Sequence, residues 1–119
     1  MNNAVVIVTY NRLELLKECL ACVCGQTIPF SRVIVVDNHS TDGTAEYLAS
    51  RTDIEVIREA ENLGGAGGFY DGLQRAGQSP YDWVLIIDDD AMIAPDYMEK
   101  LLDYANAHVG IYGLAGKVV

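Results

Sequence analysis

Three consecutive carboxylates, Asp88, Asp89 and Asp90, are the residues of this chain whose types and spacing point most directly to chemistry. They follow an apolar run over residues 83–87, which is typical of a buried strand of a parallel sheet. Side chains alternate along an extended chain, so we expect Asp88 and Asp90 to project together while Asp89 points the other way. Neighbouring carboxylates repel each other unless a cation lies between them, so the spacing predicts a site for Mn²⁺ or Mg²⁺. The alternative is a solvated acidic turn after a core strand.

Two other predicted strands also end in polar residues. The apolar run over residues 4–8 is followed by Thr9-Tyr10-Asn11-Arg12, and the run over residues 32–36 is followed by Asp37-Asn38. Ligands of open parallel sheets bind beyond the carboxyl ends of the strands. We therefore expect these residues to share one site with the three carboxylates.

A glycine-rich stretch, Gly64-Gly65-Ala66-Gly67-Gly68, lies where a helix is predicted to begin. Each glycine costs a helix roughly 1 kcal/mol relative to alanine. Close approach of the backbone to an anionic ligand at the helix N-terminus would explain that cost, and tight packing of the helix on the sheet is the alternative. No G-x-G-x-x-G follows the first strand, so the dinucleotide-binding fingerprint is absent.

The elements that must position these residues alternate between strand and helix, which predicts an α/β fold with a mainly parallel sheet. Asn11 is the expected N-cap of the first helix, which should stop at Gly25, and Thr41 or Asp42 is the expected cap of the second. Strands are predicted over residues 4–8, 32–36, 54–58, 82–88 and 110–119. Helices are predicted over residues 13–24, 42–50, 69–76 (apolar face Phe69, Leu73 and Ala76) and 95–105 (Pro95 in the first turn).

Composition limits the classes of function. The chain has 119 residues, enough for one domain, and half of them are apolar. Its formal net charge is −9, from 8 Lys and Arg against 17 Asp and Glu, which argues against nucleic acid as a partner. No apolar run is long enough to span a bilayer and no signal peptide is visible, so we expect a soluble, cytoplasmic chain.

The cysteines and histidines are not expected to bind metal. Cys19, Cys22 and Cys24 fall within one short helical stretch with no second ligand pair nearby, so we interpret them as small buried side chains. His39 and His108 lie far from them in sequence and are interpreted as turn and helix-end residues.

Four blocks together resemble the family-2 glycosyltransferases: Val8-Thr9-Tyr10-Asn11-Arg12, residues 36–44 (VDNHSTDGT), residues 61–68 (ENLGGAGG) and Asp88-Asp89-Asp90. Their order and spacing match the nucleotide-binding half of the Rossmann-like GT-A fold throughout the chain. The sequence GGAGGF (residues 64–69) is most similar to that of galactofuranosyltransferase-like and rhamnosyltransferase-like members. Phe69-Tyr70 stands where many relatives carry Arg-Asn, and Asp71 where a basic residue is common, so the donor sugar stays open.

The resemblance implies a role for each matching residue. Thr9 and Tyr10 would lie against the nucleotide base, and Asp37 would accept the N–H of a uracil ring. Asp88 and Asp90 match the outer positions of the family's Asp-x-Asp motif, with Asp90 the first choice as metal ligand and Asp89 placed on ribose or sugar. The implied donor-binding set is Thr9, Tyr10, Asn11, Arg12, Asp37, Asn62, Gly64, Gly65, Asp88 and Asp89, and the implied metal set is Asp88 and Asp90.

The resemblance further implies inverting transfer from a nucleotide-diphosphate sugar, a UDP-sugar above all, to a saccharide or lipid-linked saccharide in cell-surface polysaccharide synthesis. The family's general base lies beyond the Asp-x-Asp motif, past residue 119, so no catalytic base is assigned and residues 1–119 alone are expected to be inactive. We interpret them as the nucleotide-sugar-binding part of a protein acting at the inner membrane face, truncated at an apolar end that could support a homo-oligomer.

Two other functions fit parts of the pattern. A receiver-like signalling domain also holds Mg²⁺ in an acidic pocket, and Lys117 would fit its late lysine, but such domains place an acidic pair after the first strand, where this chain has Thr9-Tyr10-Asn11. A non-catalytic nucleotide-binding or assembly module would instead use the apolar C-terminal end as an interface.

Overall fold

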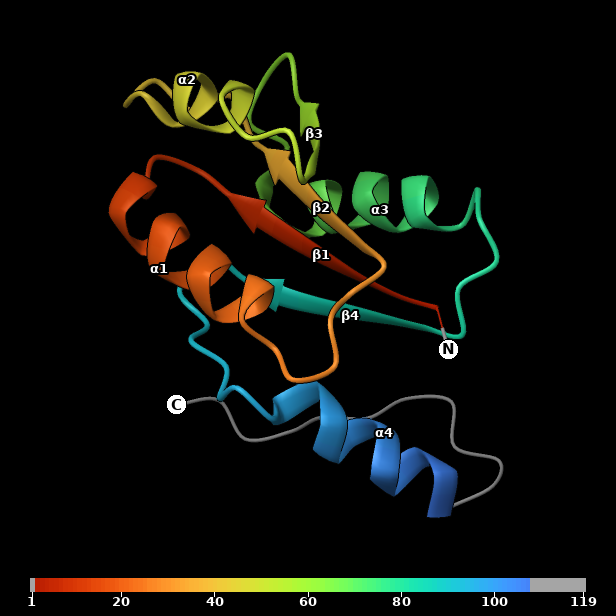
Figure 1. Ribbon diagram of the computed structural model, residues 1–119. Helices are drawn as coiled ribbons and strands as arrows, with labels where there is room; N and C mark the ends of the chain where they lie inside the picture. The colour runs from red at the N-terminus through yellow and green to blue at the C-terminus, as the bar shows by residue number, and fades with distance from the viewer. Residues whose placement is uncertain (1, 108–119) are drawn as a thin grey trace.

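A four-stranded sheet in the order β3-β2-β1-β4 lies at the centre of the computed structural model (Figure 1). The structure describes residues 2–107, and every strand pair within them is parallel. The strands are β1 (Asn3–Thr9), β2 (Arg32–Asp37), β3 (Glu55–Arg58) and β4 (Trp83–Asp88). The predicted α/β class is confirmed, while the strand predicted over residues 110–119 lies outside the described residues.

The helices are α1 (Leu13–Cys24), α2 (Thr44–Ala49), α3 (Gly64–Ala76) and α4 (Tyr97–Ala107). In Figure 1, α1 and α3 lie on opposite faces of the sheet. Strand β1 contributes side chains to the hydrophobic clusters on both faces of the sheet. Val5 and Ile7 belong to the cluster that includes residues of α1, and Val6 and Val8 belong to the one that includes residues of α3. The continuous burial of β1 explains why its sequence shows no polar alternation.

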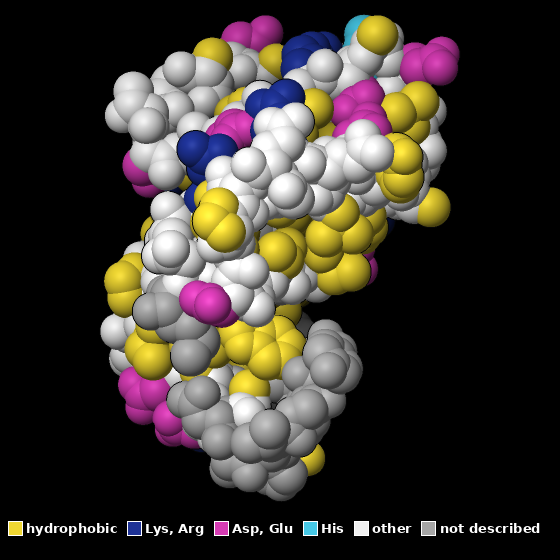
Figure 2. All heavy atoms as spheres, turned by 90° about the vertical axis from the view of Figure 1, so that its right-hand side faces the viewer, with side chains coloured by type: hydrophobic (Ala, Val, Ile, Leu, Met, Phe, Trp, Pro, Cys, Tyr) yellow, Lys and Arg dark blue, Asp and Glu magenta, His cyan; other side chains and the backbone are white. Residues whose placement is uncertain are grey.

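Strand β4 forms one edge of the sheet and keeps part of its surface exposed. Ile86 is 48% exposed, and Val84 and Leu85 are only partly buried. In Figure 2, hydrophobic side chains gather across the middle of the face turned to the viewer. Central β1 is therefore covered on both faces, whereas β4 is not.

Helix α3 buries only part of the predicted face. Of the predicted residues, Ala76 is buried and Phe69 is partly buried against the sheet, but Leu73 is 41% exposed, and Gly68 and Gly72 are buried as well. An added Cβ on Gly68 would lie 2.7 Å from Val8 Cγ1. The helix therefore packs on the sheet through its glycines, and this close packing explains the two glycines farthest from the helix start.

Two predictions about helix starts are wrong. Asn11 is not the N-cap of α1: that position belongs to Arg12 without a side-chain hydrogen bond, and Asn11 has a positive φ of 51°. The Asn11 side chain instead accepts the N–H of Thr41 at 2.7 Å. Pro95 precedes α4, which begins at Tyr97.

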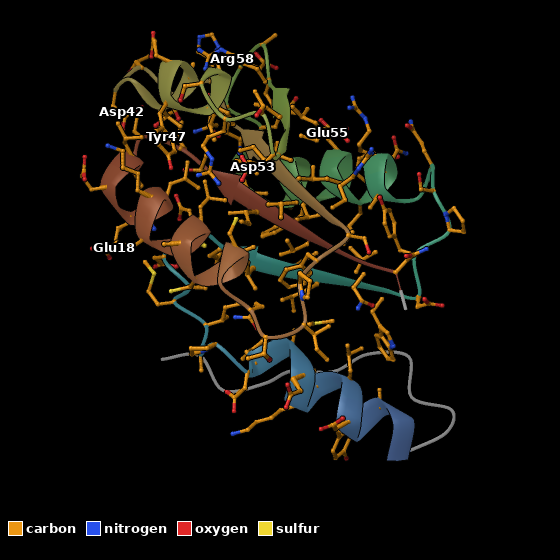
Figure 3. The ribbon with its side chains drawn as sticks, viewed as in Figure 1. Glu18, Asp42, Tyr47, Asp53, Glu55 and Arg58 are labelled. Atoms are coloured by element: carbon orange, nitrogen blue, oxygen red, sulfur yellow. The ribbon has the colours of Figure 1, made fainter. Side chains whose placement is uncertain are left out.

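Asp42 connects the starts of two helices. Its Oδ1 accepts the N–H of Thr44 at 3.2 Å and the Thr44 hydroxyl at 2.5 Å, and its Oδ2 accepts the N–H of Leu13 at 3.2 Å. Figure 3 labels Asp42 beside the start of α1, on the side of α2. Because α2 begins after Gly43 in the left-handed region (φ 97°), the Asp42 carboxylate takes over part of the capping that glycine cannot supply.

Asp42→Asn is expected to lower the free energy of unfolding at neutral pH by roughly 0.5 kcal/mol, because the amide keeps one acceptor oxygen of the cap but loses the second, which accepts the N–H of Leu13, and the side chain is exposed. The hydrogen bond from Thr44 is the main cause that holds the pKa of Asp42 below its usual value. A depressed carboxyl pKa stabilises the fold above the unfolded-state pKa, and this contribution is lost as pH falls through the folded-state pKa. Urea unfolding at pH 7 and again near pH 3 should therefore show the difference between wild type and Asp42→Asn shrink in acid. Asp103→Asn, an exposed carboxylate on α4, is the control, and an equal difference at both pH values would refute the explanation.

Gln26 ties α4 to the end of α1. This buried side chain donates through Nε2 to the carbonyl oxygens of Cys22 at 3.1 Å and Ala94 at 2.7 Å. Its Oε1 accepts the N–H of Met98, in the first turn of α4, at 2.9 Å. The chain between β4 and α4 is thus fastened at its far end by one side chain.

Candidate functional site

A cleft of about 450 Å³ opens at the carboxyl ends of β1, β2 and β4. The strand register sets its position, because Val8 of β1 pairs with Asp88 of β4 and Thr9 pairs with Asp37 of β2. This volume falls in the range of small-molecule sites. The cleft is lined by Val8, Thr9, Tyr10, Arg12, Asn38, Asn62, Gly64, Gly65, Asp88, Asp89 and Asp90.

The prediction for the three carboxylates is only partly right, because their exposure alternates but Asp89 lines the same cleft as Asp88 and Asp90. Asp88 and Asp90 are exposed, whereas Asp89 is 5% exposed. The Thr9 hydroxyl donates to Asp89 Oδ2 at 2.9 Å, and Arg12 Nη1 lies 3.4 Å from Asp89 Oδ1. Burial raises the pKa of Asp89, and the charge of Asp90 adds to that shift, while the Thr9 hydrogen bond and the Arg12 charge oppose it. Two exposed carboxylates, Asp88 and Asp90, thus line the cleft beside the buried carboxylate of Asp89.

The first two glycines of the run lie on the cleft. Gly64 has a φ of 74°, and a Cβ added to Gly64 or Gly65 would meet nothing within 4 Å. Close packing on the sheet is thus confirmed at Gly68, while Gly64 and Gly65 leave open space at the cleft, so close approach of a ligand there stays a prediction. Asn62 helps to fix the turn, because its Oδ1 accepts the N–H of Gly64 at 2.8 Å.

Asn38 lines the cleft, as expected of a polar residue at the end of a strand, and Val8 lines it although it was not an expected binding residue. Asn38 is buried, and its Nδ2 donates to the carbonyl oxygen of Gly64 at 3.0 Å while its Oδ1 accepts the N–H of Leu63 at 3.4 Å. It thereby holds the start of α3 against the end of β2. Its position immediately after a buried strand was the signal that predicted its place at this edge of the sheet.

The structure does not bring Asn11 and Asp37 into the lining, although both lie at this edge of the sheet. Asp37 is fully buried: its Oδ1 accepts the N–H of Ser40 at 2.9 Å, and its Oδ2 accepts from Arg58 Nη1 at 2.6 Å. Asp37 and Asp88 flank β1 on either side, two strand spacings or roughly 10 Å apart. They therefore face one edge of the sheet, with Asp37 set behind the surface of the cleft.

No group of three or more His, Cys, Asp or Glu side chains among residues 2–107 is arranged to hold a metal ion. Asp88 and Asp90 nevertheless offer two exposed carboxylates to one cleft, and such a pair fits a hard cation whose other ligands are water and substrate phosphate oxygens. The residues present therefore fit Mg²⁺ or Mn²⁺ as a cation shared with a ligand.

The cysteines and His39 lie outside this cleft. Cys19 is buried, and burial, followed by the charge of Asp89, raises the pKa of its thiol to about 12. Cys22 is half-buried and Cys24 is exposed, so the prediction of small buried side chains is right for Cys19 and wrong for Cys24. His39 Nδ1 lies 3.3 Å from the carbonyl oxygen of Glu59, as expected of a turn residue, and His108 is outside the described residues.

Comparison with known proteins identifies the family. The family model described as Glycosyl transferase family 2 matches residues 4–115. The chain belongs to this family. The predicted resemblance is therefore confirmed, and family-2 membership replaces the receiver-like alternative.

Characterised relatives of this family-2 chain are much longer than the chain itself. Galactofuranosyltransferase GlfT1 of Mycolicibacterium smegmatis is 34% identical over 105 residues, which cover 87% of this chain and 35% of that protein. An undecaprenyl-phosphate mannosyltransferase of Micrococcus luteus is 33% identical over 106 residues, which cover 82% of this chain and 42% of that protein. The chain thus spans well under half the length of these two relatives.

Solved structures of glycosyltransferases show the same fold. S. aureus TarS in complex with UDP-GlcNAc superposes with a TM-score of 0.77 and 25% identity over 98% of this chain and 37% of that one. The mannosyltransferase PcManGT of Pyrobaculum calidifontis, in complex with GDP-Man and Mn²⁺, superposes with a TM-score of 0.72 and 28% identity, and the match covers 87% of this chain and 32% of that one. These matches confirm the GT-A architecture. None of the helices within residues 2–107 has both the length and the apolar character that a membrane span requires.

Proposed function

We propose that the cleft at the ends of β1, β2 and β4 binds a nucleotide-diphosphate sugar together with Mn²⁺ or Mg²⁺, and that the full-length protein transfers the sugar to an acceptor hydroxyl with inversion. The observation that carries the proposal is that two exposed carboxylates, Asp88 and Asp90, line one cleft together with the open backbone of Gly64 and Gly65. Family membership and the nucleotide-sugar complexes of TarS and PcManGT support it.

The cleft offers complementary groups to a diphosphate. Asp88 and Asp90 would hold the cation, which supplies Lewis-acid stabilisation of the charge that develops on the departing diphosphate. Gly64 and Gly65 lie at the N-terminus of α3, where backbone N–H groups and the helix dipole favour anions, and their missing side chains leave room for close approach. The cleft would thus offer carboxylates to the cation and backbone N–H groups to the diphosphate.

The base and ribose would lie toward β1 and β2. Tyr10, 43% exposed at the end of β1, offers a ring against which a base can stack, and Thr9 and Asn11 shape the same corner. Two acceptor positions of Asp37 are already used, by Ser40 and by Arg58. A carboxylate has about four such positions, so Asp37 can accept a uracil N–H once the Arg58 side chain moves aside. This role favours UDP over GDP.

Residues 2–107 would thus form the donor-binding part of the protein. No carboxylate among them is assigned as the base that deprotonates the acceptor, and we place that base and the saccharide or lipid-linked acceptor site in the remainder of the protein. The role of these residues is to orient the donor. The hydrogen bond between Thr9 and Asp89 fixes the end of β1 next to the exposed carboxylates.

Calorimetric titration of the full-length protein with UDP, with and without Mn²⁺, tests the proposal. UDP binding should depend on Mn²⁺, and Asp90→Ala should weaken it at least about tenfold, since even the partners of metal ligands are worth that much. Asp103→Ala, which removes an exposed carboxylate from α4, should change nothing. Heat that persists unchanged in Asp90→Ala would contradict the metal assignment, and equal affinity for GDP and UDP would contradict the base assignment.

A further inference from the structure

Arg12 occupies a position between two carboxylates of the candidate site. It lies between the end of β1 and the first residue of α1, and its Nη1 is 3.4 Å from Asp89 Oδ1 and 3.5 Å from Asp90 Oδ2. The cation that the three carboxylates require is therefore present in the chain itself. Among the residues that line the cleft, Arg12 is the cationic one.

The two contacts of Arg12 differ in how far the carboxylate depends on them. Asp89 is buried and also accepts the Thr9 hydroxyl, so it keeps a partner when Arg12 moves. The Asp90 side chain is 53% exposed, and Arg12 is its ion-pair partner among the described residues. Asp88 makes no side-chain hydrogen bond or ion pair within residues 2–107. The cleft thus sets one guanidinium against three carboxylates, and the weakly held pair is Arg12 with Asp90.

We propose that Arg12 is an exchangeable counter-cation: its guanidinium neutralises Asp90 in the ligand-free protein, leaves Asp90 when a divalent cation binds there, and then pairs with the diphosphate of the nucleotide. This inference rests on the proposed function and adds a coupling between metal and nucleotide that the carboxylates alone do not provide. The Arg12 side chain is 52% exposed, so its end is free to change partners. Guanidinium groups bind phosphate oxygens bidentately, which makes the diphosphate a fitting second partner.

The exchange has opposite consequences for the two ligands. A divalent ion arriving alone must displace Arg12 from Asp90 and then lie near a like charge, so Arg12 lowers the affinity for metal alone. A nucleotide diphosphate brings the negative charge that the displaced guanidinium needs, so Arg12 raises the affinity for the nucleotide. Because binding linkage is reciprocal, the metal and the nucleotide each strengthen the binding of the other through the same residue.

Arg12→Gln removes the charge and keeps a polar side chain, and the test uses the full-length protein. Titration of Mn²⁺ alone, followed by the electron paramagnetic resonance signal of the free ion, should give binding about fivefold tighter than wild type, the scale of an exposed ion pair. Calorimetry with UDP at saturating Mn²⁺ should give binding about tenfold weaker, the scale of a charged hydrogen bond to phosphate. The opposite signs are the signature of exchange, and a variant that had lost its fold would lose both ligands.

Two variants serve as controls. Lys17→Gln removes one positive charge from the exposed side of α1, the helix that follows Arg12, and should leave both affinities unchanged. Arg12→Lys keeps the charge without the planar fork and should keep the wild-type Mn²⁺ affinity while losing part of the UDP affinity.

The outcomes separate the inference from the proposed function. A wild-type protein that binds neither Mn²⁺ nor UDP overturns both. A wild-type protein that binds both, with an Arg12→Gln variant whose Mn²⁺ affinity is unchanged or lower, overturns the exchange and leaves the proposed function standing.

Discussion

Arg58→Leu is expected to lower the free energy of unfolding by about 3 kcal/mol, the lower end of the range for breaking a buried ion pair. Asp37 is fully buried, and Arg58 Nη1 lies 2.6 Å from its Oδ2, so the substitution leaves a buried carboxylate that keeps the N–H of Ser40 as its hydrogen-bond partner within residues 2–107. The lower end applies because the Arg58 side chain is itself 41% exposed. Figure 3 shows Arg58 near α2 at the end of β3. Urea unfolding measures the loss.

Arg32→Leu is the matched control for this prediction. Arg32 makes an ion pair at 2.6 Å with Glu55, but Glu55 is partly exposed and also pairs with Arg75. Its loss should cost at most about 1 kcal/mol, as for surface pairs. The double variant Asp37→Asn with Arg58→Leu should recover part of the loss because no buried charge remains. If Arg58→Leu costs no more than Arg32→Leu, the buried charge at Asp37 is not what Arg58 stabilises.

Gly72→Ala is expected to lower the free energy of unfolding by roughly 2 kcal/mol. An alanine Cβ would overlap Val6 Cγ1 and lie 3.1 Å from Val36 Cγ2, and both valines belong to the central strands of the sheet. Overpacking of this kind costs about 1–3 kcal/mol, which outweighs the roughly 1 kcal/mol that alanine contributes in a helix. Thermal or urea unfolding measures the change.

Gly65→Ala serves as the control for Gly72→Ala because it lies in the same helix, where an added Cβ meets nothing within 4 Å. It should stabilise the fold or leave it unchanged. A second test combines Gly72→Ala with Val6→Ala, which removes the methyl groups that the new Cβ would meet. The two substitutions should then cost less than their sum. Equal destabilisation by Gly65→Ala and Gly72→Ala would refute close packing as the reason for the glycine.

The sheet and the position of the cleft could be predicted because they follow from local patterns. Buried parallel strands are continuous apolar runs, and polar residues directly after them must meet at one edge of the sheet. The alternating exposure of Asp88, Asp89 and Asp90 could be predicted, but the presence of Asp89 in the same cleft could not, because the chain turns directly after Asp88, where β4 ends.

The helix starts and the packing of α3 could not be predicted because they depend on distant partners. Asn11 has the type of an N-cap, yet Thr41, 30 residues away, takes its side chain. The apolar periodicity of α3 selected Leu73, whereas the distance between helix and sheet decided the outcome in favour of Gly72. Likewise, nothing in the sequence near Asp37 shows that Arg58, 21 residues later, holds its carboxylate.

The hydrogen bonds of Gln26 have a consequence for ligand encounter. They pin the carbonyl of Ala94 and the N–H of Met98, a few residues past the acidic cluster, while the pairing of β4 with β1 fixes the other side. The segment between is thereby preorganised, so a ligand that enters need not first pay the conformational entropy of ordering a loose loop. Binding at Asp88 and Asp90 is then not weakened by the cost of ordering this segment.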